Sequence, residues 1–111
     1  MKITMVEGNL DDEIEFWKEI GLAARELRGR GVWLPKPIWD TLYQFYLVSG
    51  PWKAKREEVI RESNGFCDGC GVFDFLIVHH LTYDNVFMEE LADLRPLCND
   101  CHEKVHQKEA V

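Results

Sequence analysis

Apolar residues recur at helical spacing in three stretches within residues 1–63. In the first stretch, Asn9 and the acids that follow it are typical of a helix start, and the pattern continues until the glycines of residues 28–31 end it. The second stretch, residues 38–48, is so rich in aromatic and aliphatic side chains that it predicts a helix packed on both sides, or part of a dimer contact. The third, residues 51–63, begins with a proline suited to a first helical turn. Its predicted inner face consists of Trp52, Val59 and Ile60.

The pattern changes after the Asn-Gly pair at residues 64–65, which ends the third helix. A β-rich run from Val72 to Val78 leads into His79 and His80, and residues 94–97 predict a second short strand. Between them, residues 81–93 predict a loop with one helical turn at 88–91, and a last helix begins near Asn99. The chain is therefore expected to be α+β, with an N-terminal helical extension over 1–50 and a core over 51–111.

The size and composition limit the class of protein. The chain has 111 residues, of which 46% are hydrophobic, and this fits one compact domain with an extension rather than a disordered chain. No apolar run approaches the ~20 residues of a membrane span. The first residues turn acidic at once and lack the apolar stretch of a signal peptide. We therefore expect a cytoplasmic protein.

The four cysteines form two C-x2-C pairs, Cys67/Cys70 and Cys98/Cys101. Two intervening residues let both thiolates of a pair face one ion from a tight turn, and two such pairs complete a tetrahedron around Zn2+. In a reducing compartment, this spacing predicts structural zinc rather than disulfides. A thioredoxin-like redox pair is the alternative, but it does not explain why there are two pairs.

All four histidines lie in the last third of the chain. His79 and His80 end the first predicted strand, where successive side chains point to opposite faces, so one can ligate a metal while the other faces a substrate. His102 and His106 are four residues apart on the last predicted helix and project to the same side. These positions predict a second metal site, held by one strand histidine and one or two helix histidines.

Together, these motifs resemble the HNH endonuclease pattern. The resemblance rests on the first cysteine pair, on Ile-Val-His79-His80-Leu-Thr-Tyr, and on Leu94-x2-Leu97-Cys98-x2-Cys101-His102-x3-His106. It covers about residues 51–107. It implies a ββα-metal (His-Me finger) core in the zinc-stapled form found in phage and bacterial members. It also implies metal-dependent hydrolysis of DNA phosphodiester bonds, with nicking by a monomer and double-strand cleavage by a dimer.

The resemblance implies a role for each matched residue. His80 corresponds to the general base, a task that suits neutral imidazole near pH 7. His79, His102 and His106 correspond to ligands of a catalytic divalent ion, which could be Mn2+, Mg2+, Ni2+, Co2+ or Zn2+; histidine-rich ligation favours the transition metals. Asp93 stands where the family pattern has an asparagine that braces the loop between strand and helix. An aspartate accepts the same backbone hydrogen bonds but cannot donate as asparagine does.

The net charge is −7, which argues mildly against tight non-specific binding of DNA. The charge is uneven, however, because residues 21–66 carry eight basic and five acidic side chains. Phosphate contact needs a local positive surface rather than a positive total. The candidate DNA-binding residues are on the third predicted helix: Lys53, Lys55, Arg56 and Arg61.

Each assignment has a structural alternative. His79 and His80 could be packing residues at a strand end, and His102 could replace a cysteine in a shifted Cys3His zinc site. His106 and the basic side chains could be solvated helix positions. For the whole chain, one alternative is a non-catalytic zinc-ribbon module that binds nucleic acid or protein, but it leaves the four histidines without a reason. Another is an HNH fold that has lost catalysis through Asp93. DNA is the expected partner, and the apolar stretch over 38–48 makes a homodimer a further expectation.

Overall fold

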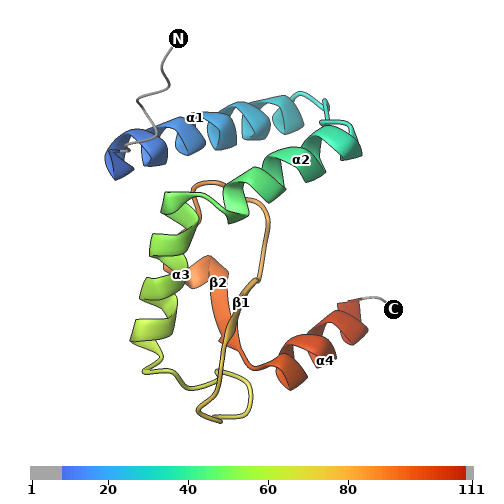
Figure 1. Cartoon of the computed structure of the whole chain (residues 1–111). Helices are drawn as coiled ribbons and strands as arrows, with labels where there is room; N and C mark the ends of the chain where they lie inside the picture. The colour runs from blue at the N-terminus through green and yellow to red at the C-terminus, as the bar shows by residue number, and fades with distance from the viewer. Residues whose placement is uncertain (1–8, 110–111) are drawn as a thin grey trace. The chain divides into compact units, whose positions relative to one another are not determined.

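A computed structural model describes residues 9–109, in an α+β arrangement of four helices and a small two-stranded antiparallel sheet (Figure 1). The elements are α1 (Leu10–Gly29), α2 (Lys36–Leu47), α3 (Gly50–Glu62), β1 (Ile77–His80), the 3₁₀ helix η2 (Leu91–Asp93), β2 (Leu94–Leu97) and α4 (Asn99–Glu109). The described chain divides into two compact units, one formed by 9–54 with 84–88 and the other by 55–83 with 89–109. The division falls within α3, and residues 84–88, which were expected in the core over 51–111, belong to the first unit.

In the first unit, α1 starts as its sequence predicts. The Asn9 side chain accepts a hydrogen bond from the backbone N–H of Asp11, and three acids occupy the first turn. The helix buries Trp17, whose ring centroid lies 5.3 Å from those of Tyr46 on α2 and Phe87 in the segment 84–88. These three aromatic side chains are the centre of the first unit, because each is at most 7% exposed.

Residues 38–48 were predicted to form a helix packed on both sides. The helix is confirmed, but the packing on both sides is wrong. The helix α2 exists, but of its twelve residues, all of them described, Tyr46 is the buried one. Ile38, Phe45 and Val48 are more than half exposed. The composition predicted the helix correctly, but the helix has a packing partner on one side within its own unit. The alternative prediction, a dimer contact through this stretch, is not tested by the structure of one chain and stays a prediction.

The chain turns sharply between α2 and α3. Ser49 is buried, and its hydroxyl donates to the carbonyl oxygen of Tyr46 at 2.6 Å. The backbone N–H of Trp52 in turn approaches the Ser49 hydroxyl at 3.4 Å, which caps the start of α3. The predicted inner face of α3 is confirmed at Trp52 and Val59, both 6% exposed.

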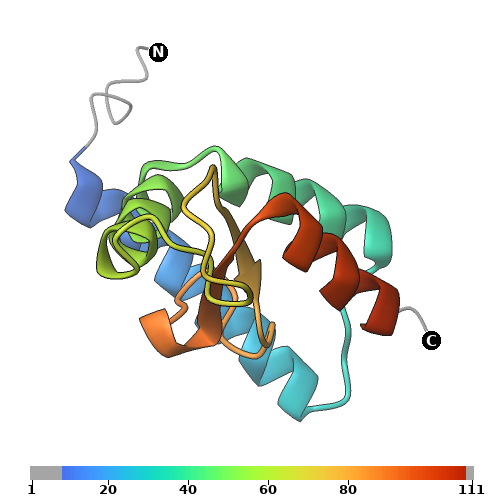
Figure 2. The ribbon, with the colours of Figure 1, turned by 90° about the horizontal axis from the view of Figure 1, so that it is seen from below.

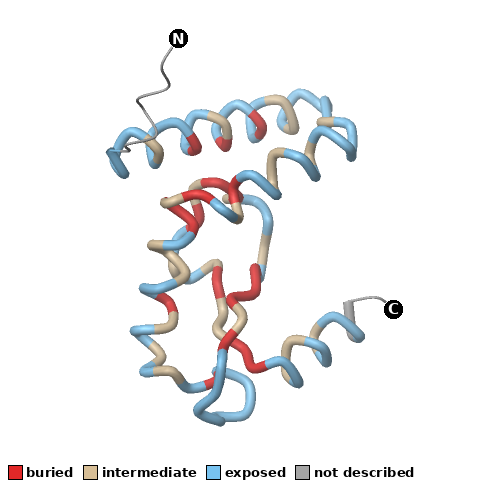
Figure 3. The backbone as a smooth tube through the Cα atoms, in the orientation of Figure 1, coloured by how far each residue is buried: buried red, intermediate tan, exposed pale blue. Residues whose placement is uncertain are grey.

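In the second unit, β1 and β2 pair antiparallel, with Ile77 opposite Leu97 and His80 opposite Leu94. Figure 2 shows α4 continuing from the end of β2. Figure 3 shows buried positions along both strands, and the core beneath them consists of Cys67, Leu76, Leu97 and Cys98. Leu97 of β2 and Leu76, which precedes β1, therefore pack with the buried cysteines.

Two sequence expectations shift in this unit. The β-rich run over 72–78 forms a strand only from Ile77, because residues 72–76 lack a continuous partner strand and make one isolated bridge, Phe66 with Phe73. The helical turn expected at 88–91 is instead the 3₁₀ helix over Leu91–Asp93. The second strand and the last helix lie where the sequence predicts them. Among residues 9–109, no helix has both the length and the apolar character to cross a membrane.

Candidate metal centres and the pocket of His80

The four cysteines lie together in the second unit. Their sulfur atoms are all within 4.8 Å of one another. The first pair sits in a tight turn, in which Gly71 donates its N–H to the Cys67 carbonyl at 2.9 Å and takes a φ of 78°. A side chain at Gly69 would place its Cβ 2.9 Å from the Cys101 sulfur, so the close approach of the two pairs requires glycine there. The prediction that the pairs converge on one site is confirmed.

Backbone amides surround the Cys67 sulfur. This atom accepts N–H groups from Gly69 at 3.2 Å, Cys98 at 3.3 Å and Cys70 at 3.4 Å. Burial works to raise the pKa of the Cys67 thiol, but these donors outweigh it and lower the pKa to about 6. Cys101 is the opposite case, because burial and the neighbouring cysteines raise its pKa to about 12. The thiol of Cys67 therefore loses its proton more readily than that of Cys101, and zinc binds cysteine as thiolate.

The chemistry of this donor set fits zinc. Four sulfur ligands in two C-x2-C turns are a typical structural Zn2+ environment, and Cys67 and Cys98 are 3% and 4% exposed. The four cysteines could therefore hold a metal ion such as zinc, at a site where Cys67 and Cys98 are buried, Cys101 is partly buried and Cys70 is exposed.

Three histidines form a second group that could hold a metal ion. His79 comes from β1, while His102 and His106 come from successive turns of α4, and one ring nitrogen of each lies within 4.8 Å of the others. The Nε2 atoms of His102 and His106 are 2.9 Å apart. Two nitrogens bound to one ion at 2.0–2.1 Å lie roughly 2.9–3.4 Å apart at right-angled or tetrahedral geometry. His79 is buried, His102 is half-buried and His106 is exposed, so the group opens toward solvent on the helix side.

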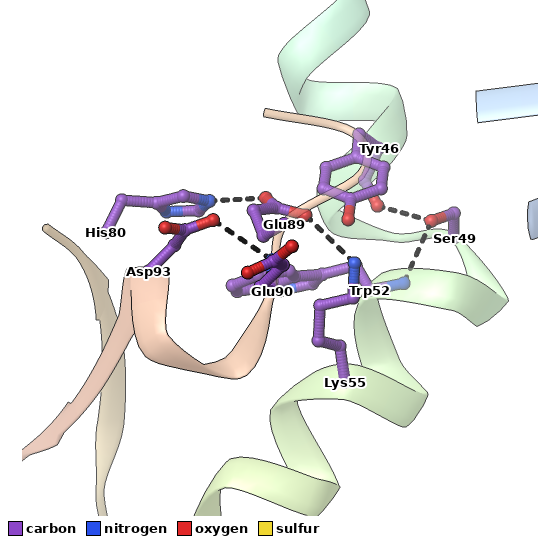
Figure 4. A network of polar contacts seen from close by, with 8 residues as sticks. All are labelled: Tyr46, Ser49, Trp52, Lys55, His80, Glu89, Glu90 and Asp93. Carbon is purple, nitrogen blue, oxygen red and sulfur yellow. Dashed lines mark hydrogen bonds and ion pairs between the residues drawn. The ribbon is translucent and has the colours of Figure 1, made fainter. Parts of the chain in front are cut away.

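His80 is not a member of this group. Its ring faces Glu89 instead, with its Nε2 atom 2.5 Å from the Glu89 carboxylate (Figure 4). The Tyr83 ring is stacked on it, with centroids 4.9 Å apart and an interplanar angle of 17°. The side chain of His80 is 3% exposed and that of Glu89 is fully buried. His79 and His80 thus have different surroundings, and His80 contacts a protein carboxylate. The expectation that one of them faces a substrate stays a prediction.

Glu89 has a second partner in the same unit. The Lys55 ammonium lies 3.2 Å from the other carboxylate oxygen of Glu89 (Figure 4). A buried carboxylate is costly unless it is paired and hydrogen-bonded, and here Lys55 and His80 each engage one of its oxygens. Lys55 was assigned to phosphate contact from the sequence, but in the structure its ammonium group pairs with Glu89.

Asp93 ties down the loop that precedes β2. Its carboxylate accepts the backbone N–H of Glu90 at 3.0 Å, which caps η2, and its carbonyl oxygen accepts the N–H of Leu81 at 2.8 Å. Leu81 follows His80 directly, so Asp93 fixes the backbone next to the predicted base. Asp93 thus accepts a backbone hydrogen bond as an asparagine would at this position, but its ionised carboxylate cannot donate one.

The other predicted DNA-binding residues differ in exposure. Lys53 and Arg61 are exposed. Arg56 is partly buried, donates to the Leu76 carbonyl at 3.3 Å, and lies 5.7 Å from the centre of the Phe75 ring. Of the four, Lys53 and Arg61 are thus the ones whose charge faces solvent.

Glu89 is the site residue that the sequence did not single out. It lies in the loop of 81–93, and its partners are 9 and 34 residues away along the chain, so no local spacing connects them. The one signal is an ionisable residue directly after the apolar run Val86-Phe87-Met88. No protein-family model matches the sequence, and comparisons with curated proteins and with solved structures found no match.

Proposed function

We propose that the chain is a metal-dependent DNA endonuclease of the HNH type, in which β1, β2 and α4 form a ββα-metal core stapled by zinc at the four cysteines. The observation that carries the proposal is the group of His79, His102 and His106 beside a separate four-cysteine group. A zinc ribbon alone accounts for the cysteines. It gives no reason for a second set of three ligands formed across a strand and a helix.

The histidine group would hold the catalytic ion. When bound, a divalent ion there supplies charge stabilisation to the scissile phosphate and the leaving 3′-oxygen. His80, the residue after His79 in β1, takes a proton from the attacking water. Asp93 holds the backbone at Leu81 and thereby the direction of the His80 side chain. The products are expected to carry 5′-phosphate and 3′-hydroxyl ends.

Phosphate contact is assigned to the exposed basic residues. Lys53 and Arg61 on α3 face solvent, whereas Lys55 and Arg56 have partners within the fold. Because the net charge is −7, binding relies on a few local contacts and on the ion rather than on a broad positive field. We expect weak, salt-sensitive DNA binding.

The direct test is to incubate zinc-loaded protein with supercoiled plasmid and Mg2+, Mn2+, Ni2+ or Co2+ in turn, with a chelator as the control. We expect ion-dependent conversion to open circles, and we expect DNA ligase to seal these nicks without prior phosphorylation. Nicks that ligase cannot seal contradict hydrolysis to 5′-phosphate and 3′-hydroxyl ends.

The burial of His80 favours a second candidate, a non-catalytic module that binds nucleic acid or protein through its zinc-stapled core. A general base must reach water, and the side chain of His80 is 3% exposed in the free chain. Under this candidate, no ion supports cleavage by folded, zinc-loaded protein. The plasmid assay therefore separates the two functions.

A further inference from the structure

We infer that Glu89 is a positioning residue for His80, and that Lys55 keeps the Glu89 carboxylate in the ionised form that accepts a hydrogen bond from His80. This inference rests on the proposed function, in which His80 is the general base. It assigns a role to the buried contact between a loop carboxylate and a strand imidazole, at 2.5 Å, and to the lysine on α3 that holds the other carboxylate oxygen.

An ionised carboxylate is only a hydrogen-bond acceptor. The His80 Nε2 atom, which faces Glu89, must therefore carry a hydrogen and donate it. In a neutral imidazole with hydrogen on Nε2, the lone pair is on Nδ1. Glu89 thus selects one tautomer of His80, and the nitrogen that accepts the proton from water is Nδ1.

Lys55 keeps Glu89 in this accepting state. An ammonium group can only donate, so it favours the ionised carboxylate. It also balances the Glu89 charge inside the unit, where the Lys55 side chain is 21% exposed and the Glu89 side chain is fully buried. Tyr83, stacked on the His80 ring, limits rotation of the imidazole out of this contact.

The arrangement makes Glu89→Gln a sharp probe. A glutamine has one accepting oxygen and one donating NH2 group. Lys55 can only donate, so it takes the amide oxygen and turns the NH2 group toward His80. The His80 Nε2 atom must then accept, which moves the hydrogen to Nδ1 and removes the base. Replacing Lys55 as well, in Lys55→Met/Glu89→Gln, removes this constraint, so that the amide oxygen can again accept a hydrogen bond from His80 Nε2.

The test combines ring-nitrogen NMR with kinetics on the full, zinc-loaded chain. Long-range proton–nitrogen spectra, assigned with His80→Ala, are expected to show hydrogen on His80 Nε2 in the wild type and on Nδ1 in Glu89→Gln. We expect kcat for plasmid nicking to fall about 10–100-fold in Glu89→Gln at nearly unchanged KM, as is usual for loss of an orienting partner. The double variant should recover part of that loss. Glu58→Gln, an exposed site on α3 with the same change of charge, should behave as wild type.

The outcomes separate this inference from the proposed function. Cleavage by the wild type together with an unchanged tautomer and kcat in Glu89→Gln overturns the role of Glu89 and leaves the nuclease intact. Hydrogen on Nδ1 in the wild type overturns it without any assay of activity. A fall in kcat that the double variant does not recover shows a structural contact instead. Absence of cleavage by the wild type with every ion rejects the proposed function and, with it, a role for Glu89 in hydrolysis.

Discussion

The Nε2 atoms of His102 and His106 lie 2.9 Å apart on successive turns of α4. The spacing i, i+4 places both rings on one face of the helix, and His79 on β1 approaches them with ring centroids 5.5 and 5.3 Å away. This relationship between a strand and the helix that follows it is the geometric basis of the proposed ion site.

Loss of one helix histidine should weaken binding of the ion at the histidine group and leave the zinc at the four cysteines in place. We expect His102→Ala to weaken binding of the second Co2+ or Ni2+ equivalent by at least about 10-fold, because one of three ligands is gone. Isothermal titration of zinc-loaded protein measures the change. Gln107→Ala, an exposed neighbour on α4, is the matched control. Equal weakening by both variants would contradict the assignment.

Loss of a buried cysteine should remove the structural metal. Cys67→Ser deletes the sulfur that three backbone amides surround, so we expect the thiolate-to-cobalt charge-transfer band of the Co2+-substituted protein to fall sharply. The melting temperature should also fall, because binding of a structural metal contributes to folding. His102→Ala should keep the band, since that side chain belongs to the other group. A band of full strength in Cys67→Ser would show that the metal is bound elsewhere.

Zinc binding at the cysteines should release protons and strengthen as the pH rises. With a pKa of about 6, Cys67 is mostly thiolate at pH 7 and has little proton to lose. Cys101, with a pKa of about 12, loses nearly a whole proton on binding. We therefore expect release of at least one and fewer than four protons at pH 7, and tighter binding at pH 8 than at pH 6. Calorimetric titrations in two buffers of different ionisation enthalpy give the number of protons released. A zinc affinity that falls as the pH rises would contradict the prediction.

Two glycines of α1 should respond oppositely to alanine. A Cβ at Gly21 would lie 2.9 Å from the Val86 carbonyl oxygen and 3.3 Å from the Met88 side chain, whereas at Gly29 nothing lies within 4 Å. We expect Gly21→Ala to lower the free energy of unfolding by about 1–3 kcal/mol. Gly29→Ala should be neutral or stabilising by up to about 1 kcal/mol, because alanine favours the helix. Urea unfolding compares them, and a similar effect of both would show that segment 84–88 does not pack on α1.

The sequence predicted those parts of the fold that depend on local signals. Asn9 caps α1, Pro51 lies in the first turn of α3, and the cysteine and histidine spacings each converge on one site. Turns and helix faces bring residues two to four positions apart together, which explains each C-x2-C pair and the pair His102/His106. The convergence of the two cysteine pairs, and of His79 with α4, was inferred from ligand chemistry, because one metal ion needs three or four ligands. The expected catalytic roles of these residues stay predictions.

Features that depend on distant partners could not be predicted. Phe45 and Val48 look like core residues by composition, yet they are exposed, because composition does not say which side of a helix has a neighbour. Phe73 and Phe75 are residues that favour a strand, but β1 begins only at Ile77, and Phe73 forms an isolated bridge with Phe66. Glu89 contacts Lys55, 34 residues away, and no periodicity encodes that contact.

The rate of plasmid nicking by the wild type and by His80→Ala, purified in parallel and assayed with the same ion, tests the central claim most directly. If the chain is an HNH-type nuclease with His80 as its base, the substitution should lower kcat about 10²–10⁴-fold while both metals stay bound. Equal rates for the two proteins would contradict the assignment of His80, and no cleavage by either, with zinc bound and the protein folded, would contradict the nuclease itself.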